Sequence, residues 1–474
     1  MDVVLCDELV QEILQRLPPS SAPSVSLVSK RWLSLLRSST SSLSLRIPPN
    51  IVTATDATAG TGNSPSLSSI LAHYPFLTNL TVISTREDAD ALLLSIAAAA
   101  CSPRLAILRF LPASPLSPSA LLSSAAAFPS LTSLRIASLL PLSFCWLSSL
   151  PSLRSFSLVR SRPKRLPGCR REPPLQEAEE PPPPPADEDE DDDGDQSTLV
   201  TLPLENLSLS GICAADRGLS WLWRRCAGLR WLQLRACEGT GDGPSSPAFP
   251  SCLPGLLGLE LRTCRAIADR VLLHAAERCR ALTSLLLYDG GSRDALRHFI
   301  HRRGAALRTL DLRLPLDLHN DHLFAIAADD HRGGTVALNG AGHQLAALRL
   351  HSCCLVTGDG LRSLAWSPAG AAIEELALVN CDVVEREPGL LTFLSQSMQR
   401  LQRLDLSHNE TLADKEHCGQ QLEVVDITRC PGIVGDAIEI LVMNACRLSQ
   451  LMVEESKVTE ATLIWLSRKA IKIG

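Results

Sequence analysis

A nine-residue pattern of apolar and polar positions recurs along most of the chain. Residues 422–430 read LEVVDITRC, and similar stretches occur at 229–237 (LRWLQLRAC) and at 256–264 (LLGLELRTC). Their consensus is L-x-x-L-x-L-x-x-C/N, with other apolar residues allowed at the Leu positions. Two apolar residues separated by one residue share a face of a strand, so each copy predicts a short strand with one buried side.

Fourteen copies of this pattern occur, and most of them lie 22 to 28 residues apart. They begin at Leu77, Leu105, Leu131, Leu153, Leu204, Leu229, Leu256, Leu282, Leu307, Leu345, Ile373, Leu401, Leu422 and Leu448. Between the copies, segments such as 267–282 and 435–451 have apolar residues at helical spacing. A unit of strand, turn, helix and turn cannot bury its apolar face alone, so we expect the units to stack on one another.

This spacing resembles that of leucine-rich repeats, in the Cys-containing subclass that is common in F-box proteins, which are abundant in plants. The resemblance implies an α/β fold for most of the chain. It implies a curved solenoid with parallel strands on its concave face and helices on its convex face. The steps that depart from the usual length are 51 residues after Leu153, 38 after Leu307 and 21 after Leu401. The last step predicts a truncated, irregular helical side in that unit.

The pattern also gives many cysteines a packing role. The ninth position holds Cys237, Cys264, Cys353, Cys381 or Cys430, and in one copy Asn409. Four more cysteines (Cys101, Cys226, Cys279 and Cys446) lie shortly before a predicted strand. A small residue is needed at the turn that leaves the strand, and Cys packs as a small hydrophobe. No two of the 16 cysteines have C-x-x-C spacing, so we favour packing over metal or redox chemistry.

Charge and hydropathy narrow the choice of partners. The net charge of −6 comes entirely from residues 160–198, which carry 6 basic and 12 acidic residues and leave 39 of each sign elsewhere. A balanced chain gives no electrostatic reason to expect nucleic acid. No apolar run approaches the roughly 20 residues that a membrane span needs. Asp2, Asp7 and Glu8 occupy the place of a basic signal region, so we expect a cytoplasmic or nuclear protein with reduced cysteines.

The first residues predict a small helical module. Asp7 is placed to cap a helix in which Leu9, Ile13, Leu14 and Leu17 fall on one face. Pro18 and Pro19 end that helix, and a second apolar stripe contains Trp32, Leu35 and Leu36.

This module resembles an F-box, most closely in the run LVSKRW. The matching residues are Leu5, Glu8, Leu9, Ile13, Leu14, Leu17, Pro18, Leu27, Val28, Ser29, Lys30, Arg31, Trp32 and Leu35. The resemblance implies binding to a Skp-type adaptor and, through it, to a cullin–RING ubiquitin ligase. The implied adaptor-binding residues are Leu9, Ile13, Leu14, Leu17, Pro18, Leu27, Val28 and Trp32. The alternative is that these helices only cap the solenoid.

These features give five segments. We predict an F-box at 1–47, a loop at 48–66, repeats at 67–161, a disordered Pro-rich and acidic insert at 162–198, and further repeats at 199–474. The basic cluster at 160–171 suits a nuclear import signal, although a solvated linker explains it as well. His319, Asp321, His322 and His331 suggest a metal site, but the polar start of a repeat helix explains HNDHL better, so we predict no metal and no cofactor.

Charged and aromatic side chains recur on the predicted concave face. Equal positions on neighbouring strands form rows, and the seventh position reads Arg235, Arg262, Tyr288, Arg313 and His351. Trp231 stands in the third row, whereas the C-terminal rows turn acidic. Arginine binds carboxylate and phosphate, and aromatic residues anchor protein contacts. We therefore predict that Trp231, Arg235, Arg262, Tyr288, Arg313 and His351 bind an acidic or phosphorylated protein substrate. Solvated polar residues are the equally supported alternative.

No catalytic motif accompanies these features. The chain has no phosphate-binding glycine loop, no H-E-x-x-H and no G-x-S-x-G. We therefore predict a non-catalytic substrate-recognition subunit of a Skp–cullin–F-box ubiquitin ligase. A repeat scaffold that binds a protein without any role in ubiquitination is the alternative, and an enzyme is a weaker one.

Overall fold

The computed structural model describes residues 5–18, 21–48, 67–86, 88–138, 143–160, 201–212, 218–238, 247–315, 317–328, 344–410, 412 and 421–474. The chain forms two compact units, with the division near Arg154 and Leu204. The predicted loop at 48–66 lies outside the described residues apart from Pro48, and the predicted insert at 162–198 lies wholly outside them. No helix in the described ranges is long and apolar enough to cross a membrane.

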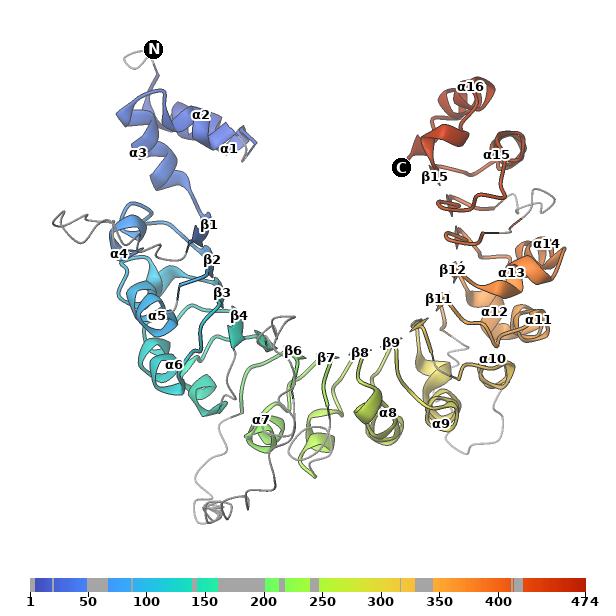
Figure 1. Ribbon diagram of the computed structural model, residues 1–474, viewed down its shortest axis with the longest axis horizontal. Coiled ribbons are helices and arrows are strands. Elements are labelled where there is room, and N and C mark those ends of the chain that lie inside the picture. The colour runs from blue at the N-terminus through green and yellow to red at the C-terminus, as the bar shows by residue number, and fades with distance from the viewer. Residues whose placement is uncertain are drawn as a thin grey trace, which may run out of the picture. The chain divides into compact units, whose positions relative to one another are not determined.

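The first unit contains a three-helix module followed by a parallel sheet. Its elements are α1 (Asp7–Arg16), α2 (Ala22–Ser26), α3 (Lys30–Ser39), β1 (Ser42–Ile47), α4 (Leu67–Leu71), β2 (Asn79–Ser84), α5 (Ala89–Ala97), η2 (Ser102–Arg104), β3 (Ile107–Pro112), α6 (Pro118–Ala125), β4 (Ser133–Ser138) and η3 (Cys145–Ser149). Strands β1 to β4 pair in parallel and in sequence order. Helices α5 and α6 lie along one face of these strands (Figure 1).

Strand β5 (Ser155–Arg160) lies at the division, and the second unit continues the alternation of strands and helices. Its elements are β6 (Asn206–Ser210), α7 (Leu219–Arg225), β7 (Trp231–Arg235), η4 (Phe249–Cys252), β8 (Gly258–Arg262), α8 (Arg265–Arg278), β9 (Ser284–Tyr288), α9 (Arg293–Arg303), η5 (Gly304–Ala306), β10 (Thr309–Arg313), α10 (Asn320–Ala327), β11 (Ala347–His351), α11 (Gly358–Trp366), α12 (Pro368–Ala372), β12 (Glu375–Val379), α13 (Asp382–Arg386), α14 (Leu390–Ser397), β13 (Arg403–Asp405), β14 (Val424–Asp426), α15 (Gly435–Asn444), β15 (Gln450–Met452), η6 (Glu455–Lys457), α16 (Glu460–Lys469) and β16 (Lys472–Ile473). Strands β6 to β16 also pair in parallel, each with the next.

Every predicted repeat contains the strand that its pattern indicates. Each of β2 to β15 begins two residues after the first apolar residue of its copy, as in Leu77 and Asn79 or Leu448 and Gln450. The apolar positions of the pattern are buried against the helices, and side chains between them face the other side of the sheet. The helices predicted at 267–282 and 435–451 are α8 and α15. The expected alternation of strand and helix is therefore confirmed.

The two end strands were not predicted. Strand β1 (Ser42–Ile47) lies in the range assigned to the helical module, but it pairs with β2 over its whole length. Leu43, Leu45 and Ile47 give it the alternation of a strand without the full nine-residue pattern. The last strand, β16, is only two residues long. Between β13 and β14 no helix occurs in the described residues, as expected for the short step after Leu401.

Strands β6 to β14 of the second unit each end in a tight turn with an unusual backbone. The eighth position of the pattern has positive φ in nine successive units, and only one of these residues is glycine. The residues are Gly211, Ala236, Thr263, Asp289, Leu314, Ser352, Asn380, His408 and Arg429. Left-handed backbone strains non-glycine residues, so the surrounding packing must hold it in place. In the first unit Ser84 occupies this position as the last residue of the longer strand β2.

The hydrogen bond made by the residue after this turn explains why cysteine recurs at that position. The Cys264 thiol donates to the carbonyl oxygen of Leu234 in the preceding unit (3.3 Å), and Cys430 donates to Leu406 in the same way (3.0 Å). Where Asn409 replaces cysteine, its side-chain nitrogen donates to the carbonyl oxygen of Leu378 (2.8 Å). All five ninth-position cysteines are buried. Among the four cysteines near helix ends, Cys446 is the exception, because it is exposed.

Candidate functional site

The N-terminal module has its own small core. Val10 and Leu14 of α1 pack with Val25 of α2 and Leu35 of α3, and Trp32 packs against them half-buried. The backbone of α1 begins after Cys6 and ends before Leu17, whose extended conformation is the one favoured before proline. The predicted stop at Pro18 is thus confirmed.

One polar contact of this module joins α3 to α1, and another caps α3. The Arg31 guanidinium donates to the Asp7 carboxylate (2.6 and 2.8 Å) and to the carbonyl oxygen of Leu5 (2.6 Å). The Ser29 hydroxyl accepts from the backbone N–H of Trp32 (3.2 Å) and caps α3. The prediction that Asp7 caps α1 is wrong: Cys6 is the cap residue, and Asp7 pairs with the third helix instead.

The apolar residues of α1 divide into two stripes, where the sequence pattern indicated one. Val10 and Leu14 face inward, four residues apart. Leu9, Ile13 and Leu17 are also four residues apart and are 37 to 49% exposed. A helix with apolar residues on two sides has one side available for another partner.

The loop between α2 and α3 adds further exposed apolar side chains. Leu27 is 86% exposed and Val28 is 58% exposed, and Pro18 is exposed as well. Of the eight residues predicted to bind an adaptor, only Leu14 lies in the core and only Trp32 is half-buried. Exposed apolar side chains in such density mark an interaction surface. Leu14 and Trp32 support the module from within, and Val10, which the sequence analysis missed, is its most buried residue.

The face of the second unit's sheet that is free of helices carries the predicted row of charged residues. Arg235, Arg262, Tyr288, Arg313 and His351 lie side by side in register on strands β7 to β11. The row is therefore real, but the charge of its arginines is largely compensated.

Carboxylates two residues away on the same strand bind these arginines. Arg313 makes two 2.8 Å hydrogen bonds to Asp311, and Arg262 is hydrogen-bonded to Glu260. Residues i and i+2 of a strand share a face, so each pair forms within its own strand. Asp311 is only 1% exposed, and its hydrogen bonds hold the pKa of Arg313 above its usual value.

A network extends from Asp311 to the next strands. Arg349 lies 3.7 Å from Asp311 and donates a 2.6 Å hydrogen bond to Glu375. His351 lies 3.9 Å from Asp311, and burial together with the nearby Arg313 lowers the pKa of His351. The network is internally balanced, which leaves little of its positive charge available for an acidic ligand.

Two residues of the predicted set remain open to solvent. Trp231 is 41% exposed, and its indole ring covers Gly258 of the neighbouring strand, where a Cβ atom would collide with it. Arg235 is exposed and has no ion-pair partner in the described part of the chain. Whether any residue of this row binds a substrate stays a prediction.

The acidic side chains of the C-terminal rows form hydrogen bonds with the backbone at the ends of their own strands. The Asp405 carboxylate accepts from the N–H of Ser407 (2.9 Å), and Asp426 accepts from the N–H and hydroxyl of Thr428 (2.9 and 2.7 Å). Both side chains therefore stabilise the ends of their strands.

Neither histidine cluster on the helix side gathers metal ligands. His322 is fully buried, with one ring nitrogen 3.0 Å from the backbone of His319 and the other 3.0 Å from the carbonyl of Arg293. The polar helix start at HNDHL is thus confirmed, and His331 lies outside the described residues. Across the described ranges no three His, Cys, Asp or Glu side chains are grouped for a metal.

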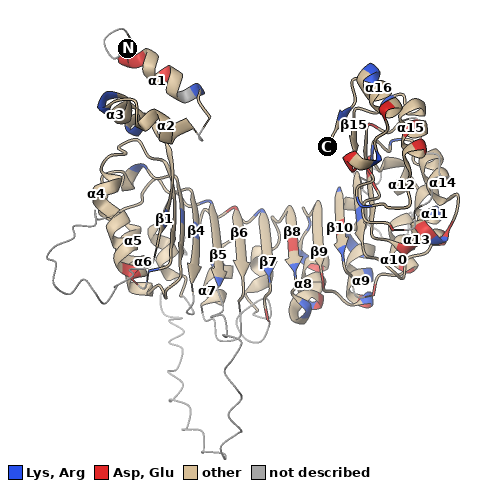
Figure 2. Ribbon diagram, turned by 45° about the horizontal axis from the view of Figure 1, so that its top comes forward, with Lys and Arg blue, Asp and Glu red and all other residues tan. Residues whose placement is uncertain are grey.

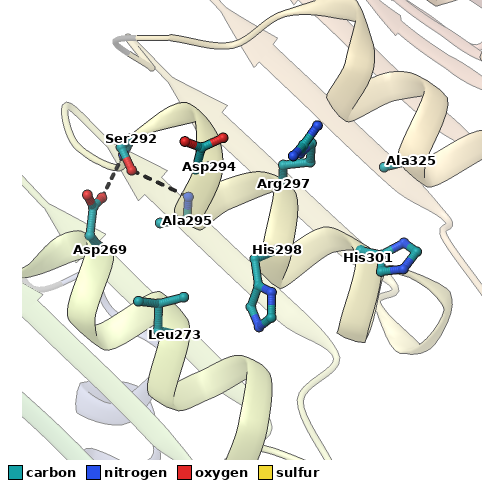
Figure 3. Close-up of a pocket in the computed structure, with 9 residues that line it drawn as sticks. All are labelled: Asp269, Leu273, Ser292, Asp294, Ala295, Arg297, His298, His301 and Ala325. Carbon is teal, nitrogen blue, oxygen red and sulfur yellow. Dashed lines mark hydrogen bonds between the residues drawn. The ribbon is translucent and has the colours of Figure 1, made fainter.

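A hollow between helices α8, α9 and α10 is lined by His298 and His301 among other residues. Ser292 links its walls, because its N–H donates to Asp269 (2.6 Å) and its hydroxyl caps α9. His298 and His301 of α9 point away from Asp294 in Figure 3.

A comparison with known protein families bears on the N-terminal part of the chain. The family model described as "F-box domain" matches residues 4–42. A search of curated protein sequences found no match. One similar solved structure is the complex of Rad7 and Elc1 in yeast, with 13% identity, 98% coverage of this chain, 92% coverage of that chain and a TM-score of 0.43. Another is the TLR13–ssRNA13 complex, with 15% identity, coverages of 81% and 51% and a TM-score of 0.40.

F-box domains bind Skp-type adaptors, and F-box proteins are generally non-catalytic subunits. The matched residues coincide with the three helices that surround the core of Val10, Leu14, Val25 and Leu35. Residues 4–42 are therefore an F-box domain, followed by a long series of parallel strands covered by helices.

Proposed function

We propose that this chain is the substrate-recognition subunit of a Skp–cullin–F-box ubiquitin ligase. The single observation that carries the proposal is the set of exposed apolar side chains on the F-box, Leu9, Ile13, Leu17, Leu27 and Val28. They would dock on a Skp-type adaptor, and the parallel sheet would hold a protein substrate.

Chemistry in this assembly belongs to the partner subunits. The chain's contribution is proximity, because a substrate held beside a charged ubiquitin-conjugating enzyme reacts at a high effective concentration. We place the complex in the cytosol or nucleus, where the free thiols of the described cysteines stay reduced.

The test is co-purification of the full chain with a Skp-type adaptor. Ile13→Asp and Leu27→Asp place a charge on the exposed surface, and Ser34→Asp is the matched control at an exposed position of α3. Burying one such apolar side chain contributes about 1.5–3 kcal/mol, so each of the first two changes is expected to weaken adaptor capture at least roughly tenfold. Leu14 is unsuitable because it belongs to the core.

Circular dichroism establishes that all variants are folded. Capture by the wild type and the Ser34 variant, with loss in the Ile13 and Leu27 variants, supports the proposal. If the folded wild type captures no adaptor, the three helices serve as a cap on the sheet, and the chain is a protein-binding scaffold.

A further inference from the structure

The exposed sheet face of the first unit differs in charge from that of the second. Strands β1 to β4 contain Arg46, Arg109 and Arg135 but no Asp or Glu. Figure 2 shows acidic residues on strands of the second unit, such as β8, and none on β1 to β4. All three side chains are exposed. None of them has an ion-pair partner among the described residues.

Two of these arginines occupy the same register on neighbouring strands. Ser44, Thr81, Arg109 and Arg135 form one row across β1 to β4. Adjacent strands are about 4.8 Å apart, so the side chains of Arg109 and Arg135 begin close together. Like charges directly opposite one another destabilise a sheet. In the second unit, arginines on the sheet face such as Arg262 and Arg313 are compensated by carboxylates.

An oxyanion bound between Arg109 and Arg135 would remove this repulsion. Guanidinium groups donate two parallel hydrogen bonds to carboxylate or phosphate, and the hydroxyl groups of Ser44 and Thr81 continue the same row. The next row offers different chemistry, because Arg46 lies in register with Ile83 and Leu111, which are half-buried. The surface therefore suits a peptide with an acidic group and an apolar side chain nearby.

Nucleic acid fits this surface less well. The only aromatic side chain on β1 to β4 is Phe110, which is fully buried. Single-stranded nucleic acid binds where exposed aromatic rings stack on its bases along a basic groove. Three arginines without such rings favour a short acidic segment of a protein.

We propose that the exposed face of β1 to β4 binds an acidic or phosphorylated segment of the substrate protein, with Arg109 and Arg135 sharing one oxyanion. The inference deepens the proposed function, on which it rests, and it names the substrate class. It also moves the site from the row of Arg262 and Arg313 to the first unit.

The experiment measures peptide binding to the full chain by fluorescence anisotropy. The probes are a labelled Gly-Ser peptide with a central Asp-Glu-Asp-Glu run, the same peptide with one phosphoserine, and a neutral version with Asn and Gln. The test variant is Arg109→Glu/Arg135→Glu. The matched control is Arg224→Glu/Arg447→Glu, which makes the same change in net charge at exposed positions of the second unit. Adaptor capture is measured on the same samples.

We expect the acidic peptides to bind the wild type and the control, and the neutral peptide to bind neither. Charge-assisted hydrogen bonds contribute about 1.5 kcal/mol or more each, so the test variant is expected to bind roughly a hundredfold more weakly, or about tenfold for each arginine. Binding is expected to weaken at high salt, because salt then shortens the distance over which charges attract one another to about 3 Å. Comparing the two acidic peptides tells whether carboxylate or phosphate is the preferred group.

Equal binding of the acidic peptides to the wild type and the test variant would overturn the proposal, and so would tighter binding of a uridine 12-mer than of either peptide. A third protein, with the seven acids at 187–193 changed to their amides, tests the chain's own acidic run. If peptide binding appears only in that protein, the surface serves the chain itself, and a substrate role is refuted. If the test variant still captures the adaptor, its peptide binding and its F-box function are independent of one another.

Discussion

The Asn409 side chain offers the sharpest test of the role assigned to the ninth position. Asn409 is 1% exposed. Its amide donates to the carbonyl oxygens of Leu378 (2.8 Å) and Leu406 (2.7 Å), and its oxygen accepts from the N–H of Cys381 (2.8 Å). The change Asn409→Ala removes all three hydrogen bonds and leaves their backbone partners buried.

The expected loss of folding free energy follows from the number of buried groups that lose a hydrogen-bond partner. An unsatisfied buried donor or acceptor costs about 1–3 kcal/mol. Carbonyl oxygens have a second lone pair and suffer less, so we take the lower end for each and expect a loss of about 3 kcal/mol. The matched variant Asn409→Cys restores one donor, because Cys381 donates to Leu350 in the same way (3.3 Å). It is expected to lose only about 1–2 kcal/mol.

Hydrogen exchange measured by mass spectrometry is the suitable assay, since stacked repeats open locally and one global transition does not describe them. In the alanine variant, amides of β12 to β14 should exchange roughly a hundredfold faster, and the cysteine variant should lie between the alanine variant and the wild type. Unchanged protection in the alanine variant would refute the role of this side chain as a connection between units.

Further expectations concern thiols, a glycine and pH. Burial raises the pKa of the Cys226 thiol to about 12, so iodoacetamide at pH 8 should label the exposed Cys446 and spare Cys226; equal labelling in the folded protein would contradict this. Gly370→Ala would drive a Cβ atom into the backbone of the preceding helix and should cost about 1–3 kcal/mol. Gly304→Ala meets only ordinary contact and should be neutral or slightly stabilising in urea unfolding; similar losses in both would disprove the clash. Burial and the neighbouring arginine of β10 lower the pKa of His351, so the unfolded chain takes up a proton first and stability should fall as pH drops below about 6.5. His351→Gln should flatten that part of the curve, and an unchanged slope would show that the titration lies elsewhere.

The strands could be predicted from the sequence because their pattern reports burial directly. Apolar residues separated by one residue must share a face, and the repeat places that face against the helices each time. The end strands lack this support, because β1 has a sheet neighbour on one side only. Its alternation of Leu43, Leu45 and Ile47 was a usable signal, but its position directly after α3 favoured assignment to the helical module.

The turn at the eighth position could not be predicted from residue types. Positive φ is expected at glycine or asparagine, yet the turn is occupied by residues as different as Leu314 and Arg429. The conformation is imposed by the strand before it and by the buried ninth residue after it. Only the stacked units together determine it, so no single repeat carries the signal.

The two-sided character of α1 was visible in the sequence but was read as one stripe. Leu9, Ile13 and Leu17 follow one four-residue spacing, and Val10 and Leu14 follow another. Side chains four residues apart share one face of a helix, so each set forms its own stripe. Only the packing of α2 and α3 decides which stripe becomes the core, because Val25 and Leu35 meet Val10 and Leu14.

The charges on the sheet face show why counting arginines along a row does not locate an anion site. Glu260 and Asp311 stand two residues before Arg262 and Arg313 and share their face, so the sequence already contains the pairing. Changing Arg262 and Arg313 to glutamate would set two carboxylates beside each other on each strand and would destabilise the sheet. Loss of substrate capture in such a variant would not establish contact.

Arginines without a carboxylate on their strand allow a clearer test of ligand binding, because their substitution does not disturb an ion pair. Arg109 and Arg135 already repel one another, so changing either of them to alanine removes a repulsion and leaves no buried carboxylate unpaired. We expect Arg135→Ala to leave stability unchanged or slightly raised in urea unfolding while it weakens peptide binding. A surface that loses affinity while the fold gains stability is one where charge is kept for a ligand. If Arg135→Ala instead lowers stability, the guanidinium supports the sheet, and its exposure has another cause.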